Sequence, residues 1–168
     1  MVGPIRALSG RDESFAGQAA FQTVSGDEMT SQTSFTFGTR LVGSVADARP
    51  RVEAALRAEG FGILTEIDVQ STLKAKLGVD RPPFLILGAC NPQLAHRALE
   101  ADPSIGALLP CNVVLRADGE ETIVEAMDPL AVLGIVESAG VHAVAGEARA
   151  RLERAISALD VWARPDRS

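Results

Sequence analysis

The segment that most constrains this chain is 84–90 (FLILGAC), which is apolar at every position. A strand that is apolar on both of its faces lies inside a sheet rather than at an edge. Asn91 follows it as a helix N-cap, and Pro92 occupies the first helical position, so two strong start signals coincide. The sequence therefore predicts an interior strand that runs directly into a helix.

Strand-like and helix-like segments alternate along the rest of the chain. The expected strands are residues 33–42, 61–69, 84–90, 111–116 and 122–127. The expected helices are residues 44–58, 69–77, 91–101, 130–136 and 147–159. Asp118 and Gly119 form a hairpin turn between the last two strands. This order predicts an α+β fold with a single mixed or antiparallel sheet and helices packed on one face.

Period-two alternation sets further expectations for the strands. It places Phe35 and Phe37 on one face of the first strand. In the second strand it places Ile63, Thr65 and Ile67 together on one face.

Two helix boundaries follow from special residues. Ser44 and Asp47 form a capping box, but Pro50 predicts that the helix starts nearer Asp47 or is kinked. Gly134 and Gly140 interrupt the pattern near the C-terminus, so the last helix is expected to begin at Glu147.

Composition bounds the functional classes. The chain has 168 residues and a formal net charge of −6, which suits one domain and disfavours nucleic acid or an anionic membrane as a partner. No apolar run is long enough to span a membrane, and the first residues lack a signal-peptide core, so we expect a cytoplasmic protein with two free thiols. We expect a flexible arm at 1–30, one domain at 31–161 and a frayed tail at 162–168.

Four short motifs carry a resemblance to a known family. They are residues 65–69 (TEIDV), 88–92 (GACNP), 109–113 (LPCNV) and 128–129 (DP). Over about 33–159 the chain resembles the domain of unknown function family 302, DUF302. The resemblance implies a β-α-β(4)-α fold related to the TATA-binding-protein fold, and a homodimer. It implies no activity and leaves any cofactor unknown.

Glu66 and Asp68 are the first candidate site. They lie two apart on a predicted strand, so their carboxylates share a face and are able to hold a cation or share a proton. The alternative is that they are solvated residues near the end of the strand, and two carboxylates are too few for a tight calcium or magnesium site.

The dipeptides Cys90-Asn91 and Cys111-Asn112 are the second candidate site. Cys90 precedes a helix N-terminus, whose dipole favours a thiolate, so a thiol, metal or haem site is one interpretation. Buried structural cysteines, with Asn91 as a cap, are the other. A simple crossover separates the two cysteines by roughly 23 Å, unless the 102–110 loop carries the chain back.

His96 and His142 are isolated, and neither has a second ligand at metal-binding spacing, so no metal site is predicted. Three functional hypotheses remain. The first is a homodimeric binding or sensing domain with a small-molecule ligand near Glu66, Asp68, Cys90 and Asn91. The second is a redox protein, enzyme or metal or haem binder that uses Cys90 and Cys111. The third is an interaction module that docks through the arm at 1–30.

Overall fold

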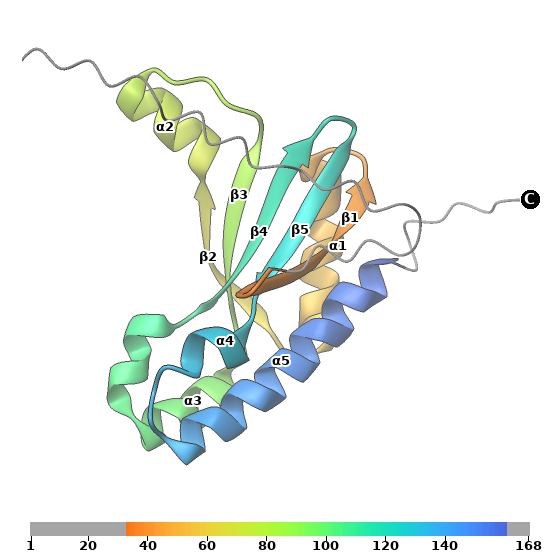
Figure 1. Cartoon of the computed structure of the whole chain (residues 1–168). Helices are drawn as coiled ribbons and strands as arrows, with labels where there is room; N and C mark the ends of the chain where they lie inside the picture. Colours follow the sequence, from red (N-terminus) through yellow and green to blue (C-terminus); the bar gives the residue numbers. More distant parts are fainter. Residues whose placement is uncertain (1–32, 161–168) are drawn as a thin grey trace, which may run out of the picture.

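The structure is a computed structural model that describes residues 33–160, so the predicted arm and tail lie outside it. Within this range five strands form one sheet in the order β1-β5-β4-β3-β2, and all neighbouring strands are antiparallel (Figure 1). The strands are β1 Thr36–Val42, β2 Gly62–Asp68, β3 Phe84–Cys90, β4 Cys111–Asp118 and β5 Glu121–Met127. The α+β prediction is confirmed, and β3 is paired on both sides as expected for an interior strand.

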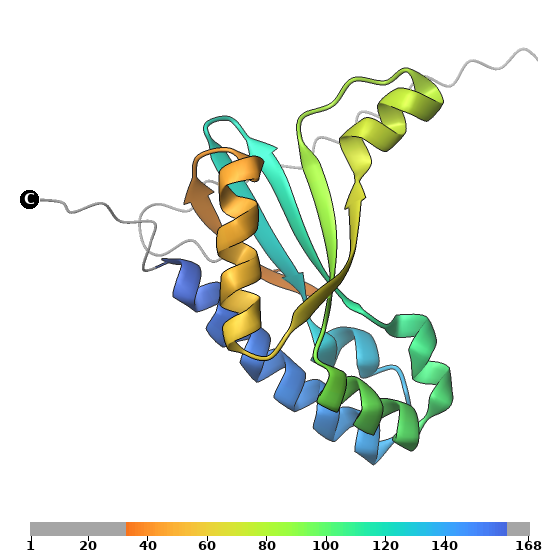
Figure 2. The same ribbon diagram turned by 180° about the vertical axis from the view of Figure 1, so that it is seen from behind.

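The helices gather on one face and at the two ends of this sheet. They are α1 Val45–Ala58, α2 Val69–Leu77, α3 Pro92–Ala101, the 3-10 helix η1 Pro103–Leu108, α4 Pro129–Leu133 and α5 Ala139–Asp160. Figure 2 shows α1 lying along one face of the sheet, with α5 beside it. Elements α3, η1 and α4 lie at one end of the sheet, and α2 projects from the other (Figures 1 and 2). None of the helices in the described range is long and apolar enough to cross a membrane.

Helix α1 begins as its capping box predicts. The Asp47 backbone N–H donates to Ser44 Oγ over 3.2 Å, and the Ser44 N–H donates back to Asp47 Oδ2 over 3.4 Å. The expectation that Pro50 would move the helix start is wrong, because α1 runs from Val45 and contains the proline. Pro50 removes one hydrogen bond, and the burial of the apolar stripe of α1 offsets this loss.

Two groups of buried side chains make up the core. The larger group fills the space between the sheet and helices α1 and α5, and includes Leu41, Val52, Leu56, Leu87, Val113, Leu115, Val124, Leu152 and Ile156. The smaller group joins α3, η1, α4 and the first half of α5, and includes Leu94, Ala98, Ile105, Leu133, Val141, Val144 and Ala148. The two groups meet at the lower ends of β3 and β4 in Figure 1. The side chains at these ends of the two strands therefore lie at the junction of the two groups.

Two predictions on the ends of elements are wrong. Phe35 does not share a face with Phe37, because it precedes β1 and is 57% exposed while Phe37 is buried. Helix α5 begins at Ala139 rather than Glu147. Gly140 lies inside α5, where an added Cβ would come within 2.9 Å of Ala101, so this glycine permits close packing against α3 instead of breaking the helix.

One region of the sheet differs from the rest. From Gly62 to Ile86, which spans β2, α2 and the first three residues of β3, no residue is buried. Helix α2 is nevertheless capped at both ends, by the Asp68 side chain and by Gly78 in the left-handed conformation. The predicted domain limits of 31–161 and the cytoplasmic location stay predictions.

Candidate functional site

The structure brings both cysteines to one place. Cys90 is the last residue of β3, and Cys111 is the first residue of β4, directly opposite Ala89. Asn91 is buried and caps α3 by accepting a hydrogen bond from the Leu94 N–H over 3.2 Å. Cys90, Asn91 and Cys111 therefore line the same small cavity.

A wide separation of the cysteines, which a simple crossover predicts, is wrong for a physical reason. Helix α3 and η1 both lie beyond one end of the sheet, so the chain re-enters the sheet at the end where it left (Figure 1). Strand β4 then runs antiparallel to β3. The alternative, in which the 102–110 loop carries the chain back, is the one observed.

The thiols are less acidic than a cysteine at a helix start was expected to be. Burial raises the pKa of Cys90 above its ordinary value. Burial raises the pKa of Cys111 to about 11, and the neighbouring Cys90 adds to the shift. Burial thus acts on the Cys90 thiol in the direction opposite to the effect expected of a helix dipole, and a reactive role for Cys90 stays a prediction.

The cavity beside the cysteines is small and apolar. Its volume is about 20 Å³, and its remaining lining includes Phe61, Leu94, Leu109, Leu133 and Val144. Such a space has room for about one water molecule. It is a gap where the two core groups meet, and it is far smaller than a site for an organic ligand.

Glu66 and Asp68 lie elsewhere. Cys90 is opposite Gly62 in the ladder, whereas Glu66 is opposite Leu87, which places Glu66 about four residues or roughly 13 Å along the strand. Glu66 accepts a hydrogen bond from Arg49 Nε over 3.0 Å. Asp68 caps α2, and its hydrogen bonds from Ser71 hold the pKa of Asp68 below its ordinary value. Both carboxylates thus have structural partners.

A β-bulge changes the faces of β2. Ile63 is opposite Ala89 and Thr65 is opposite Gly88, so Leu64 is the extra residue. Since adjacent residues of β3 point to opposite faces, Ile63 and Thr65 do as well. The expectation that they share a face is therefore wrong.

The remaining candidates lie apart from the cysteine cavity. Asn112 is exposed and pairs with Gly88. His96 and His142 are both exposed. No group of three or more His, Cys, Asp or Glu residues with metal-binding proximity is present in residues 33–160. The six predicted ligand-binding residues fall into three separate places, and their role in binding stays a prediction.

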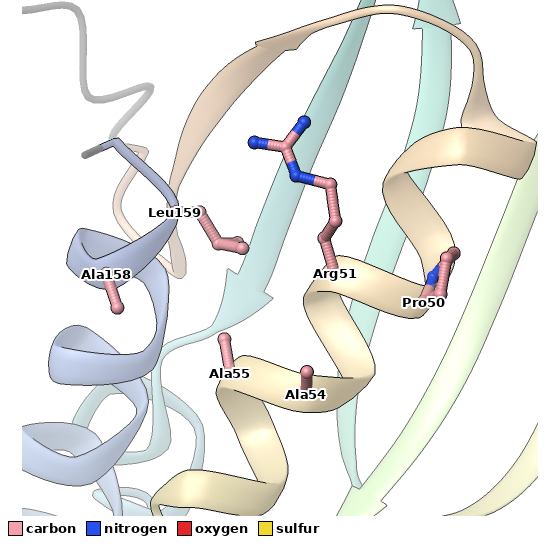
Figure 3. Close-up of a pocket in the computed structure, with 6 residues that line it drawn as sticks. All are labelled: Pro50, Arg51, Ala54, Ala55, Ala158 and Leu159. Carbon is pink, nitrogen blue, oxygen red and sulfur yellow. The ribbon is translucent and has the colours of Figure 1, made fainter. Parts of the chain in front are cut away.

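A larger groove lies in a region for which the sequence predicts no site. It is formed by α1 and the C-terminal part of α5, and its volume is about 380 Å³. Figure 3 shows its lining residues: Pro50, Arg51, Ala54, Ala55, Ala158 and Leu159. Adjacent small residues on α1 and α5 were the available signal, but only the packing of two helices distant in sequence makes a groove from them.

Comparisons with known proteins agree with the fold. A family model described as "Domain of unknown function DUF302" matches residues 37–159. The crystal structure of an uncharacterized conserved protein DUF302 from Bacillus stearothermophilus is similar, with a TM-score of 0.68 and 28% sequence identity. The match covers 73% of this chain and 96% of that chain. A search of curated proteins finds no match.

Proposed function

Because this chain belongs to the DUF302 family, for which no activity is described, we propose from its geometry that it is a self-associating binding domain. Two copies would dock through residues 62–79, which we term the β2–α2 segment. The supporting observation is that this segment has no buried residue and yet is rich in large apolar side chains. The cross-linking experiment distinguishes a second copy from any other occupant of this surface.

Exposed apolar side chains concentrate in the β2–α2 segment. Leu64, Ile67, Leu77 and Val79 are 65%, 49%, 68% and 48% exposed. They are four of the nine large apolar residues that are exposed in the described range. Concentrated apolar exposure of this kind marks interaction surfaces.

Strand β2 and helix α2 each lack what normally stabilises such elements. Strand β2 is at the edge of the sheet, with one row of backbone groups not paired to another described strand. Helix α2 has nine residues, a length that is marginal in water without tertiary packing. A second copy would pack against α2 and would pair with the free edge of β2.

The charge of the segment suits a second copy of an acidic protein. The chain carries a net charge of −6, which opposes association in general. Residues 62–79 instead carry two acidic and two basic side chains, so their formal charge is zero. Like-charge repulsion between two copies of this segment is therefore small.

Lysine chemistry tests the proposal directly. Lys74 and Lys76, both on α2, are the only lysines in the chain, so an amine-reactive cross-linker reports on α2 and the N-terminal amine alone. We expect a covalent dimer joined through Lys74 or Lys76, and a sedimenting species of twice the chain mass. Lys74→Arg with Lys76→Arg should abolish the cross-link through α2 and keep the sedimenting dimer.

A matched pair of variants locates the interface. Leu77→Glu should weaken dimerisation by about tenfold or more, since a charge would replace an exposed apolar side chain of the proposed interface. Ile135→Glu should have no effect, because Ile135 is equally exposed, at 74%, but outside the segment. A monomeric wild-type chain would contradict the proposal, as would an intramolecular cross-link from the N-terminal amine to Lys74.

The thiol hypothesis has less support from the geometry. With the pKa of Cys111 near 11, and that of Cys90 raised, both thiols should react slowly with iodoacetamide at pH 7 and faster as the pH rises. Cys90 should react before Cys111, because it is the less buried. Peptide mapping by mass spectrometry measures both rates. Rapid alkylation of Cys90 at neutral pH would restore the redox alternative.

A further inference from the structure

We propose that the groove between α1 and α5 is occupied by the chain's own C-terminal segment, with the indole of Trp162 inserted between the two helices. Residues 161–168 follow α5 directly and lie outside the described structure. The groove and the β2–α2 segment are on different elements, so this inference does not depend on dimerisation. Its basis is a repeat of buried residues in α5, together with the position and the size of the groove.

The repeat of buried residues in α5 leads to Trp162. Buried positions recur along this helix at alternating intervals of four and three residues, a spacing that keeps them in one stripe. Each is at most 4% exposed, and they are Val141, Ala145, Ala148, Leu152, Ala155 and Leu159. The next position of the repeat is three residues after Leu159, and it is Trp162. One further turn of helix would therefore place this side chain on the buried face of α5.

The residues that follow α5 permit this further turn. Val161, Trp162 and Ala163 include neither glycine nor proline, the two residues that most disfavour a helix. The first proline after α5 is Pro165, and a proline disfavours helical backbone at the residue before it, here Arg164. The sequence therefore allows the helix to continue to Ala163 and stops it directly afterwards.

The groove lies beside the end of the described part of α5. Arg154 of α5 donates a hydrogen bond of 2.7 Å to Glu59, the residue that ends α1, so the two helices are joined there. One turn later on α5, Ala158 and Leu159 line the groove, and Figure 3 shows Leu159 extending from α5 toward α1. Trp162 follows these two residues by four and three positions, and residues at such spacings are neighbours on a helix surface. The indole would therefore reach the groove without a linker.

The size and the walls of the groove suit an indole. Its volume is about 380 Å³. An apolar cavity of about 150 Å³ is enough to hold benzene, and an indole is a benzene ring fused to one five-membered ring. The lining residues other than Arg51 are alanine, leucine and proline, so the walls are mostly hydrocarbon. Removing these walls and an aromatic ring from water together favours docking.

Docking of this segment has a consequence for binding. The groove would be part of the core, and a ligand from solution would enter it only by displacing Trp162. Such a displacement would couple ligand binding to release of the C-terminal segment. The proposal therefore replaces the frayed tail expected at 162–168 with a segment that is docked at Trp162.

Fluorescence of the full chain tests the proposal, because Trp162 is the only tryptophan. We expect emission at shorter wavelength than in the urea-unfolded chain, and quenching by acrylamide that is several-fold weaker. Ala54→Leu narrows the groove, so it should move the emission to longer wavelength and strengthen the quenching, with an unchanged circular dichroism spectrum. Ala58→Leu is the matched control, since Ala58 is also an exposed alanine of α1 but does not line the groove. It should change neither property.

Nuclear magnetic resonance locates the indole. We expect nuclear Overhauser contacts between the Trp162 ring and the methyl groups of Ala54 or Ala55 within one chain. An indole that is quenched as strongly in the folded chain as in the unfolded chain would overturn the proposal. A shielded indole without contacts to these methyl groups would also overturn it. So would contacts that appear only between differently labelled chains in a mixture, because the occupant would then come from a second copy.

Discussion

The part of the sheet under α1 and α5 and the β2–α2 segment share one continuous hydrogen-bonded ladder, but they differ completely in burial. Leu87, Val113, Leu115 and Val124 are fully buried between the sheet and the two helices. No residue of the β2–α2 segment is buried. Backbone pairing therefore continues beyond the hydrophobic core, and side-chain burial decides where the chain is stable by itself and where it offers a surface.

The largest expected difference is in stability. Leu115→Ala should lower the free energy of unfolding by about 2–5 kcal/mol, because it leaves a cavity in the core. Leu77→Ala should change it by no more than about 0.5 kcal/mol in dilute protein, since the side chain is exposed. Urea denaturation measures both. Equal losses would show that α2 is part of the same cooperative core.

Hydrogen exchange should separate the two regions next. Amides of β4 should exchange only through global unfolding, whereas those of α2 should open locally because none of the residues of α2 is buried. Mass spectrometry at increasing protein concentration sharpens the comparison. Protection of α2 should rise with concentration, as mass action requires of a dimer interface, while protection of β4 stays constant. Protection of α2 that is independent of concentration would argue against self-association.

The smallest effect is a response to acid. Hydrogen bonds from Ser44 and Ser71 lower the pKa of Asp47 and Asp68, the carboxylates at the starts of α1 and α2. Because the folded pKa is depressed, the stabilisation is full above the unfolded pKa of 3.8 and is lost as pH falls through the folded pKa.

Nuclear magnetic resonance titration should show the consequence. Below pH 4 the amides of α2 should shift toward unfolded positions, while α1 stays folded because its apolar stripe is buried. Asp68→Asn keeps a capping oxygen without a titrating group, so it should remove the response in α2. A response that persists in this variant would assign it to another group.

The elements could be predicted from the sequence because their signals are local. Asn91-Pro92, Ser44 with Asp47, and the Asp118-Gly119 turn each act through the backbone of a few adjacent residues. The β-bulge at Leu64 has no such signal, because register depends on what β3 presents opposite. One extra residue in β2 was enough to reverse the predicted faces beyond it.

The candidate site was harder to predict because it depends on where the chain re-enters the sheet after α3 and η1. Cys90 and Cys111 meet only because α3 and η1 turn back at the end of the sheet. The thiol pKa shifts depend on burial among Phe61, Leu94 and other cavity-lining residues. The Cys-Asn dipeptides of the sequence do not indicate this burial. The α1–α5 groove is made by Ala54 and Ala158, which are distant in sequence and unremarkable alone.

The confinement of both lysines to α2 has a further consequence, for proteolysis and protein engineering. A protease that cuts only after lysine has its two sites in one exposed helix, and no other in the chain. Apart from the dipeptide between the two sites, it leaves two large pieces that would still share the β2–β3 ladder, and the piece that begins in α2 would keep β3, β4, β5 and α5. Loop and helix tips of this kind tolerate breaks and insertions. Helix α2 is thus the natural position for a split of the chain, for new termini in a circular permutant or for an inserted reporter domain.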